Sequence, residues 1–282
     1  MSPQTIKQPA MVSLAIALTA LGVLGLGNGD FALVWQPVPP WVPMREALAY
    51  AFGAVSLAAG LGLFWPRTAG WAAAIALAYF FLWWLLLRVP AFIASPLTNA
   101  GGLGENTVAL GGALALFAAL HPSPGRLDFL RGAAGLRLAR ILLGVGLIGC
   151  GEAHFYFLQQ TAAFVPAWLP GHLPWAVATG SGFLAAAAAI LAGVWPRLAA
   201  TMATGMMGAF TVLIWVPDAL SAPHDRFNWT ALTVSWTLTA AAWIVAQSYR
   251  GTEWLALRGT ATDRSAHAAA RDPTPAPPAG LS

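Results

Sequence analysis

Long apolar stretches separated by short polar segments run through most of the chain, and they predict membrane-spanning helices. A bilayer core about 30 Å thick needs about 20 mostly apolar residues in a helix. Eight stretches approach this length, at about 10–27, 47–64, 69–88, 102–120, 136–156, 175–194, 198–216 and 229–248. The predicted fold class is therefore an all-α membrane protein with eight transmembrane helices.

Short motifs recur in the same order in the two halves of the chain. Residues 38–43 read Val-Pro-Pro-Trp-Val-Pro, and residues 165–170, at an offset of 127, read Val-Pro-Ala-Trp-Leu-Pro. Residues 64–67 and 194–197 form a second pair, at an offset of 130. Recurrence at nearly one spacing indicates an internal repeat. We therefore expect two four-helix repeats, and an even number of spans in each gives both copies the same, parallel orientation.

This pattern predicts four parts along the chain. Residues 1–120 are the first four-helix membrane repeat, 121–135 a cytoplasmic linker, 136–249 the second repeat and 250–282 a disordered cytoplasmic tail. The tail is rich in Ala, Pro, Thr and Arg and has no apolar period, which is typical of disorder. The first apolar stretch follows a lysine, as in a signal peptide, but no Ala-x-Ala site follows it. It is therefore predicted to be a retained anchor.

The composition and the positions of the basic residues support a membrane location. Only 9% of the residues are charged and 58% are hydrophobic, whereas soluble domains carry about 25% charged residues. Basic residues concentrate on the cytoplasmic side of membrane proteins. With the amino terminus inside, eleven of the 14 basic residues lie on the inner side, and the outer side holds Arg45, Arg88 and Arg226. We expect a multi-pass protein of the bacterial inner (plasma) membrane with both termini cytoplasmic.

The same features narrow the range of partners. The formal charge of +4 is not gathered in a patch interleaved with aromatic residues, which argues against a nucleic-acid partner. The expected partner is the lipid bilayer. Cys150 is the single cysteine, so an intramolecular disulfide is excluded. Its apolar surroundings in the sequence predict an inert buried thiol.

The predicted outer connections are unusually rich in proline and tryptophan. They comprise residues 34–43, 88–99, 164–175 and 216–229. Tryptophan favours the headgroup level of a bilayer, and proline stiffens segments that are not helical. Two interpretations remain open, namely interfacial loops that cap the bundle and a lid over a cavity open to the outside.

Glu152, His154 and His172 form the candidate polar site, and the first two lie at the outer end of the fifth predicted helix. Glu152 and His154 are two positions apart and so do not share one helix face. An intramembrane carboxylate is a functional hypothesis by default, and a residue that caps a neighbouring loop is the alternative. His172 and His224 lie in the outer loops that follow. Such histidines could relay protons or hold a metal, but their spacing matches no compact ligand motif, and no metal site is predicted.

Secondary candidates on the same predicted side are Arg88, Glu105, Asp218, His224 and Asp225. Arg88 follows an apolar run, and it either extends to the interface or attracts an anionic headgroup or substrate. Asp218, Asp225 and the neighbouring Arg226 are most simply read as a solvated loop with a local Asp–Arg pair. No phosphate-binding loop, nucleophile elbow or haem-attachment motif is present, and the sequence names no cofactor.

The second half resembles the DoxX-like membrane proteins of bacteria, which are bundles of four transmembrane helices. The resemblance rests on Gly-Glu-Ala-His-Phe at 151–155, the run 161–172 ending Leu-Pro-Gly-His, Trp175, and Thr-Gly at 179–180. Residues 136–248 would be one such unit, and 10–120 a diverged copy without the His-Phe element. The resemblance implies an inner-membrane location and carries over Glu152, His154 and His172 as candidate polar residues.

The resemblance implies little chemistry. The family takes its name from a subunit linked to thiosulfate:quinone oxidoreduction, and other members are tied to redox or stress functions. We therefore expect an accessory component of a redox or quinone-linked membrane system, with a quinone or lipid and a membrane redox partner as candidate partners. A small-molecule or lipid transporter and a membrane oxidoreductase that itself contacts quinone are the alternatives, so catalytic activity stays open.

Overall fold

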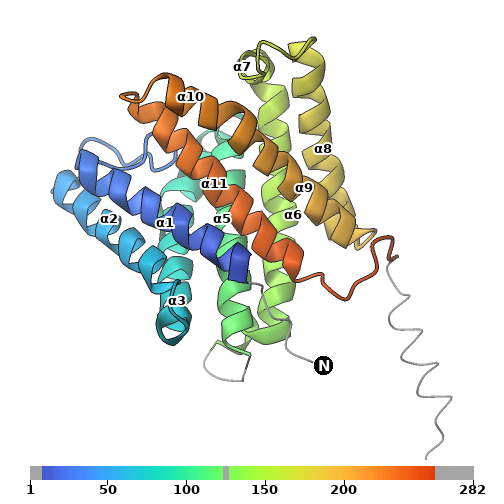
Figure 1. Ribbon diagram of the computed structural model, residues 1–282, viewed down its shortest axis with the longest axis horizontal. Coiled ribbons are helices and arrows are strands. Elements are labelled where there is room, and N and C mark those ends of the chain that lie inside the picture. Colours follow the sequence, from blue (N-terminus) through green and yellow to red (C-terminus); the bar gives the residue numbers. More distant parts are fainter. Residues whose placement is uncertain (1–7, 123–126, 258–282) are drawn as a thin grey trace, which may run out of the picture.

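The computed structural model describes residues 8–122 and 127–257 (Figure 1). In these residues the chain is helical and contains no β-strand. The long helices are α1 (Gln8–Asn28), α2 (Arg45–Gly62), α3 (Pro66–Trp83), α5 (Pro96–Leu120), α6 (Gly132–Tyr156), α8 (His172–Ala192), α9 (Pro196–Phe210) and α11 (Arg226–Gln247). The short elements are η1 (Trp84–Arg88), α4 (Val89–Ala94), η2 (Asp128–Leu130), α7 (Leu158–Ala163), η3 (Thr211–Trp215) and α10 (Val216–Ser221).

Seven helices in the described part of the chain are long and apolar enough to cross a membrane, by length and composition. The long helix that falls short is α2, which has 18 residues and carries Arg45 and Glu46 in its first turn. These two charges lower the mean hydropathy of a helix that has only the minimum length of a candidate span. Seven spans of this kind make the chain an all-α, multi-pass membrane protein, whereas the composition does not establish the eighth predicted span.

Two segments predicted as proline-stiffened loops are helical instead. Pro90 and Pro217 lie in the first turns of α4 and α10, and each of these short helices follows a π-helical turn, η1 or η3. Proline is accepted in the first turn of a helix because the N–H that it lacks has no partner there. The wider π turn lets the chain continue from α3 and α9 without a loop. The prediction of non-helical loops over 88–99 and 216–221 was therefore wrong.

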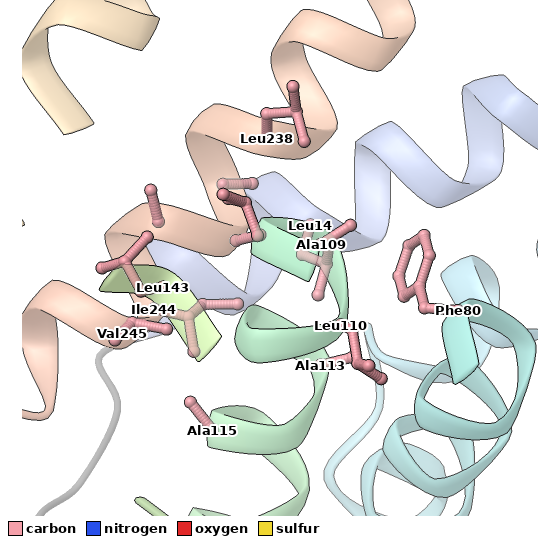
Figure 2. Packing of buried hydrophobic residues seen from close by; sticks show 14 of the residues in the cluster. Leu14, Phe80, Ala109, Leu110, Ala113, Ala115, Leu143, Leu238, Ile244 and Val245 are labelled. Atoms are coloured by element: carbon pink, nitrogen blue, oxygen red, sulfur yellow. The ribbon is translucent and has the colours of Figure 1, made fainter. Parts of the chain in front are cut away.

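The core of the bundle lies around α5. Figure 2 shows Ala109, Leu110 and Ala113 of α5 among Leu14 of α1 and Ile244 of α11. The helix packs against α3, α6 and α11 and is buried along most of its length. Its many alanines and glycines allow three neighbours to approach closely, because small residues bring helix backbones together in a membrane.

Glycines bring α5 and α6 into backbone contact. A Cβ atom at Gly104 would lie 2.6 Å from the Gly146 carbonyl oxygen, and one at Gly149 would lie 2.4 Å from the Ala100 carbonyl oxygen. A Cβ at Gly60 of α2 would similarly lie 2.5 Å from the backbone nitrogen of Thr19 in α1. The glycines at these positions therefore serve close helix packing.

The long helices pack in two successive series. In the first, α1 contacts α2, α2 contacts α3 and α3 contacts α5; in the second, α6 contacts α8, α8 contacts α9 and α9 contacts α11. The last helices of the two series, α5 and α11, pack against each other, while α6 packs on α5 and α1 packs on α11. The predicted anchor α1 is thus an integral part of the bundle.

An ion-pair network joins the two series at one end of the bundle. Asp30 pairs with Arg45, and its second oxygen lies 3.0 Å from a guanidinium nitrogen of Arg226. Arg226 also donates a 2.6 Å hydrogen bond to the Phe31 carbonyl oxygen. Arg226 was expected to pair with a neighbouring aspartate in its own loop. That expectation was wrong, because the partner lies 196 positions away along the chain.

The network should make a pH-dependent contribution to stability. Burial raises the pKa of Asp30, but hydrogen bonds from Arg226, the Phe31 N–H and Arg45 outweigh burial and leave the pKa below its ordinary value of 3.8. A lowered folded-state pKa stabilises the fold above pH 4, roughly, and this contribution is lost as the pH falls through the folded-state pKa. Asp30→Asn should lower stability at pH 7 by about 1 kcal/mol per lost pair, and less at pH 3.

Thermal unfolding in detergent at the two pH values measures this difference. Glu46→Gln is the matched control, since this exposed carboxylate is not an ion-pair partner within the described residues. An Asp30→Asn effect that is equally large at pH 3 and pH 7 would contradict an ionic contribution.

At the opposite end, the segment that follows α11 holds the turn between α8 and α9. The Trp195 N–H donates to the Ala256 carbonyl oxygen (2.8 Å), and Arg197 donates to the Thr252 carbonyl oxygen (3.0 Å). The Arg197 guanidinium also lies 4.1 Å from the centroid of the Trp254 ring. The predicted linker (121–135) and tail (250–282) are only partly covered, because 123–126 and 258–282 lie outside the described residues.

Candidate functional site

A cavity of about 1330 Å³ lies within the second series of helices. Its walls come from α5, α6, α8, α9 and α11, and residues 33–35 of the first half close one side. Most of the lining is apolar, with Phe183, Met206, Phe210 and Leu238 among its side chains. A space of this size and polarity suits a lipophilic molecule, since ligand sites are mostly apolar with a few polar groups that fix orientation.

We infer that the cavity opens sideways between α8 and α9, because three of its lining residues on these helices are exposed. They are Ala178 of α8 and Met202 and Gly205 of α9, and Met202 is 64% exposed. These two helices meet at the turn over 193–195 and diverge toward α7 and α10 (Figure 1). Because both are candidate membrane spans, the opening faces the region where lipid chains would lie.

His154 points into the cavity from the last turns of α6. Its Nδ1 lies 2.8 Å from the Cys150 carbonyl oxygen, and its ring packs edge-on against Phe183 at 5.2 Å and beside Phe210 at 6.1 Å between centroids. Gly180 of α8 makes room for this side chain, because a Cβ there would lie 2.8 Å from the His154 Cβ. A carbonyl oxygen only accepts, so Nδ1 carries the hydrogen, and Nε2 of the neutral ring has a free lone pair.

Glu105 of α5 is the carboxylate in the cavity wall. In the described part of the chain, neither of its oxygens receives a hydrogen bond from the protein. Its electrostatic neighbour is Arg88, whose guanidinium lies against Gly102, one helical turn before Glu105. Arg88 is 5% exposed and donates to the carbonyl oxygens of Val34 (2.7 Å) and Trp35 (2.6 Å). Arg88 thus supplies the positive charge behind a carboxylate that faces the cavity.

Three threonine hydroxyl groups of the lining donate their hydrogens within the protein. Thr179, Thr201 and Thr230 each donate to the carbonyl oxygen four residues earlier, at 2.8–2.9 Å. Ser235 lies 2.8 Å from Thr211, whose own hydroxyl lies 3.0 Å from the Met207 carbonyl oxygen. Either hydroxyl can be the donor between Ser235 and Thr211. Thr179, Thr201 and Thr230 present lone pairs to the cavity rather than hydrogens.

Only part of the predicted polar site faces this cavity. His154 and Glu105 line it, and Arg88 lies directly behind, whereas Glu152 and His172 are outside the lining. Glu152 is exposed on another face of α6, as the two-residue spacing from His154 predicts, and His172 begins α8. Glu152 and His172 therefore do not share this cavity with His154.

The remaining candidates, Asp218, His224 and Asp225, lie in and directly after α10. His224 and Asp225 are exposed, and the Asp225 carboxylate caps α11 by accepting from the Phe227 N–H at 2.7 Å. The Asp218 carbonyl oxygen accepts from the Asn228 side chain. None of the three lines the cavity. Cys150 is buried, as predicted, and it forms part of the cavity wall.

Several lining residues were missed by the sequence analysis. Ser235 and Thr230 look like ordinary small residues of an apolar helix, and Phe183 and Phe210 look like lipid-facing aromatics. The lining positions Thr230, Val234 and Leu238 of α11 recur at a helical period, but Val234 and Leu238 are apolar and read as core. The opening between α8 and α9 has no local signal, because it depends on the angle between two helices.

In the described part of the chain, no group of three or more His, Cys, Asp or Glu side chains is placed to hold a metal ion. The polar groups of the cavity lining are Glu105, His154, Gln160, the tryptophan indoles and the hydroxyl groups. Comparisons of the chain with protein families, with characterised proteins and with solved structures each give no match.

Proposed function

We propose that this protein binds a lipophilic molecule from the bilayer and serves as an accessory component of a quinone-linked or other redox system in the bacterial inner membrane. The observation that carries the proposal is the cavity of about 1330 Å³ that opens between α8 and α9. A side opening between two apolar helices suits a ligand that is already dissolved in the membrane. A membrane quinone, with a polar ring and an apolar tail, has the required shape and solubility.

The cavity favours this function over transport of a polar solute. A polar solute needs a chain of polar groups through the bundle, whereas the lining here is mostly apolar with Glu105 and His154 as its ionisable groups. A binding protein needs one enclosed apolar space and a few polar contacts, which is the arrangement observed.

The proposal includes a finer architecture of eight spans in two parallel DoxX-like repeats, with both termini cytoplasmic. Its support is the order of elements. The π-helical turns η1 and η3 begin 127 residues apart, as do α4 and α10 and also α2 and α8, while α3 and α9 begin 130 residues apart. The helices of each series pack in the same order. If α1 is equivalent to α6 and α5 to α11, the contact between α5 and α6 is equivalent to the contact between α11 and α1. In this scheme α2 is the eighth span, held in the bundle by α1 and α3.

A bulky residue at the opening provides the test. Gly205 lines the cavity, and nothing lies within 4 Å of a Cβ placed on it. Gly205→Phe should therefore obstruct the opening without disturbing the fold and should reduce the lipophilic molecules that co-purify with the protein several-fold. Solvent extraction and mass spectrometry of equal amounts of purified protein measure this effect.

Gly27→Phe is the matched control. Gly27 is also a helical glycine with nothing within 4 Å of its Cβ position, but it lies in α1, away from the cavity. Its bound molecules should equal those of the unmodified chain. Equal amounts and identities of bound molecules in both variants and in the unmodified chain would overturn the proposed function.

A further inference from the structure

The polar side chains deep in the cavity are hydrogen-bond acceptors. Glu105 presents a carboxylate that is unpartnered within the described residues, and the neutral ring of His154 presents the Nε2 lone pair. The Thr230 hydroxyl donates its hydrogen to the Arg226 carbonyl oxygen. A ligand that enters this region therefore meets the lone pairs of Glu105, His154 and Thr230.

The lining also carries hydrogen-bond donors, among them the side-chain amide of Gln160, an exposed residue of α7. The indole groups of Trp168 and Trp175 belong to residues that are 68% and 45% exposed at the outer end of the bundle. The indole N–H of Trp35 is buried inside the wall. Arg88 directs one guanidinium nitrogen to two carbonyl oxygens behind the carboxylate. The region around Glu105 and His154 is therefore suited to a hydrogen-bond donor on the ligand.

The walls beside these acceptors are aromatic. Phe183 and Phe210 flank the His154 ring, and Trp215 packs against Phe227 at 6.2 Å between centroids. Aromatic side chains favour contact with the face or edge of another ring. A planar ring is therefore the head group that this surface accommodates best.

We infer that the cavity selects a lipid whose planar ring carries a hydroxyl group, bound with that hydroxyl donating to Glu105 or His154 and with the apolar tail leaving between α8 and α9. This inference rests on the proposed function and specifies its ligand class. It predicts discrimination between ring lipids that differ only in the presence of a donor. An unsatisfied carboxylate facing an apolar space is costly, so a donor gains affinity there, whereas an ether oxygen meets another lone pair.

The test compares 4-dodecylphenol with 4-dodecylanisole, its methyl ether, on the purified full-length chain in phosphatidylcholine nanodiscs. Native mass spectrometry over a concentration series gives an apparent dissociation constant for each probe. The phenol should bind about tenfold more tightly, as expected for one hydrogen bond to a charged acceptor. In Glu105→Gln the ratio should fall toward one, because the charge is lost. Glu152→Gln, which removes an exposed carboxylate outside the lining, should keep the original ratio.

The outcomes separate the two proposals. Equal affinities in the unmodified chain, or a ratio that Glu105→Gln leaves unchanged, would overturn the donor preference. If both probes bind equally and Gly205→Phe excludes them, the proposed lipid-binding function stands without this preference. If neither probe binds and no lipophilic molecule co-purifies, both proposals are wrong.

Discussion

Replacing Gly149 by alanine is expected to destabilise the protein by about 3 kcal/mol, the upper part of the range for overpacked sites. The added Cβ would lie 2.4 Å from the Ala100 carbonyl oxygen and 3.0 Å from the Gly104 Cα. Both are backbone atoms of α5, so relief requires one helix to move away from the other. Because α5 and α6 belong to different series, this separation also loosens the junction between the two halves.

The midpoint of thermal unfolding in detergent measures this loss, with Gly27→Ala as control. Nothing lies within 4 Å of a Cβ at Gly27, and alanine is a better helix former than glycine by about 1 kcal/mol. The control should therefore be neutral or slightly stabilising. Equal midpoints for the two variants would contradict direct backbone contact between α5 and α6.

Arg88→Met should cause a comparably large loss of stability, about 3–5 kcal/mol, as for other buried charges deprived of a partner. The substitution removes both hydrogen bonds to the carbonyl oxygens of Val34 and Trp35. It also leaves the carboxylate of Glu105 without its neighbouring positive charge. Arg88→Lys should cost less, since lysine keeps a positive charge near Glu105.

A double variant separates the two contributions. Arg88→Met combined with Glu105→Leu removes both charges, so it should be more stable than Arg88→Met alone by the cost of the uncompensated carboxylate. The remaining deficit measures the two lost hydrogen bonds. A double variant no more stable than Arg88→Met would show that Glu105 and Arg88 are not coupled. The unfolding midpoints of the three variants and the unmodified chain complete the cycle.

The helices could be predicted from the sequence because each depends on a local pattern. Apolar runs bounded by Pro, Gly and charged residues predicted α1, α6 and α11 to within a few residues. The helical segments after Arg88 and Trp215 were missed, since a proline reads as a break unless the π turn before it is known. The α2 helix was predicted in place, although its composition alone does not qualify it as a span.

The site was harder to predict because it depends on contacts between distant segments. His154 was identified from its motif, and Glu105 from being a carboxylate near an apolar run. That Arg88 stands behind Glu105 follows from the close approach at Gly102, which no local pattern reveals. The pairing of Asp30 with Arg226 likewise joins helices from different halves. Conversely, Glu152 was predicted as a site residue because it lies two positions from His154. That spacing places the two side chains on different faces of α6, and Glu152 lies away from the cavity.

The contacts of Trp195 and Arg197 with the segment that follows α11 determine how the cavity can change its width. These hydrogen bonds hold the turn between α8 and α9 against residues 252–256. Because the turn over 193–195 is held in place, α8 and α9 can separate only by rotating about it. The distance between the two helices then grows with distance from the turn. A ligand too wide for the resting opening must therefore enter near α7 and α10, where a small rotation at the pivot produces the largest gap.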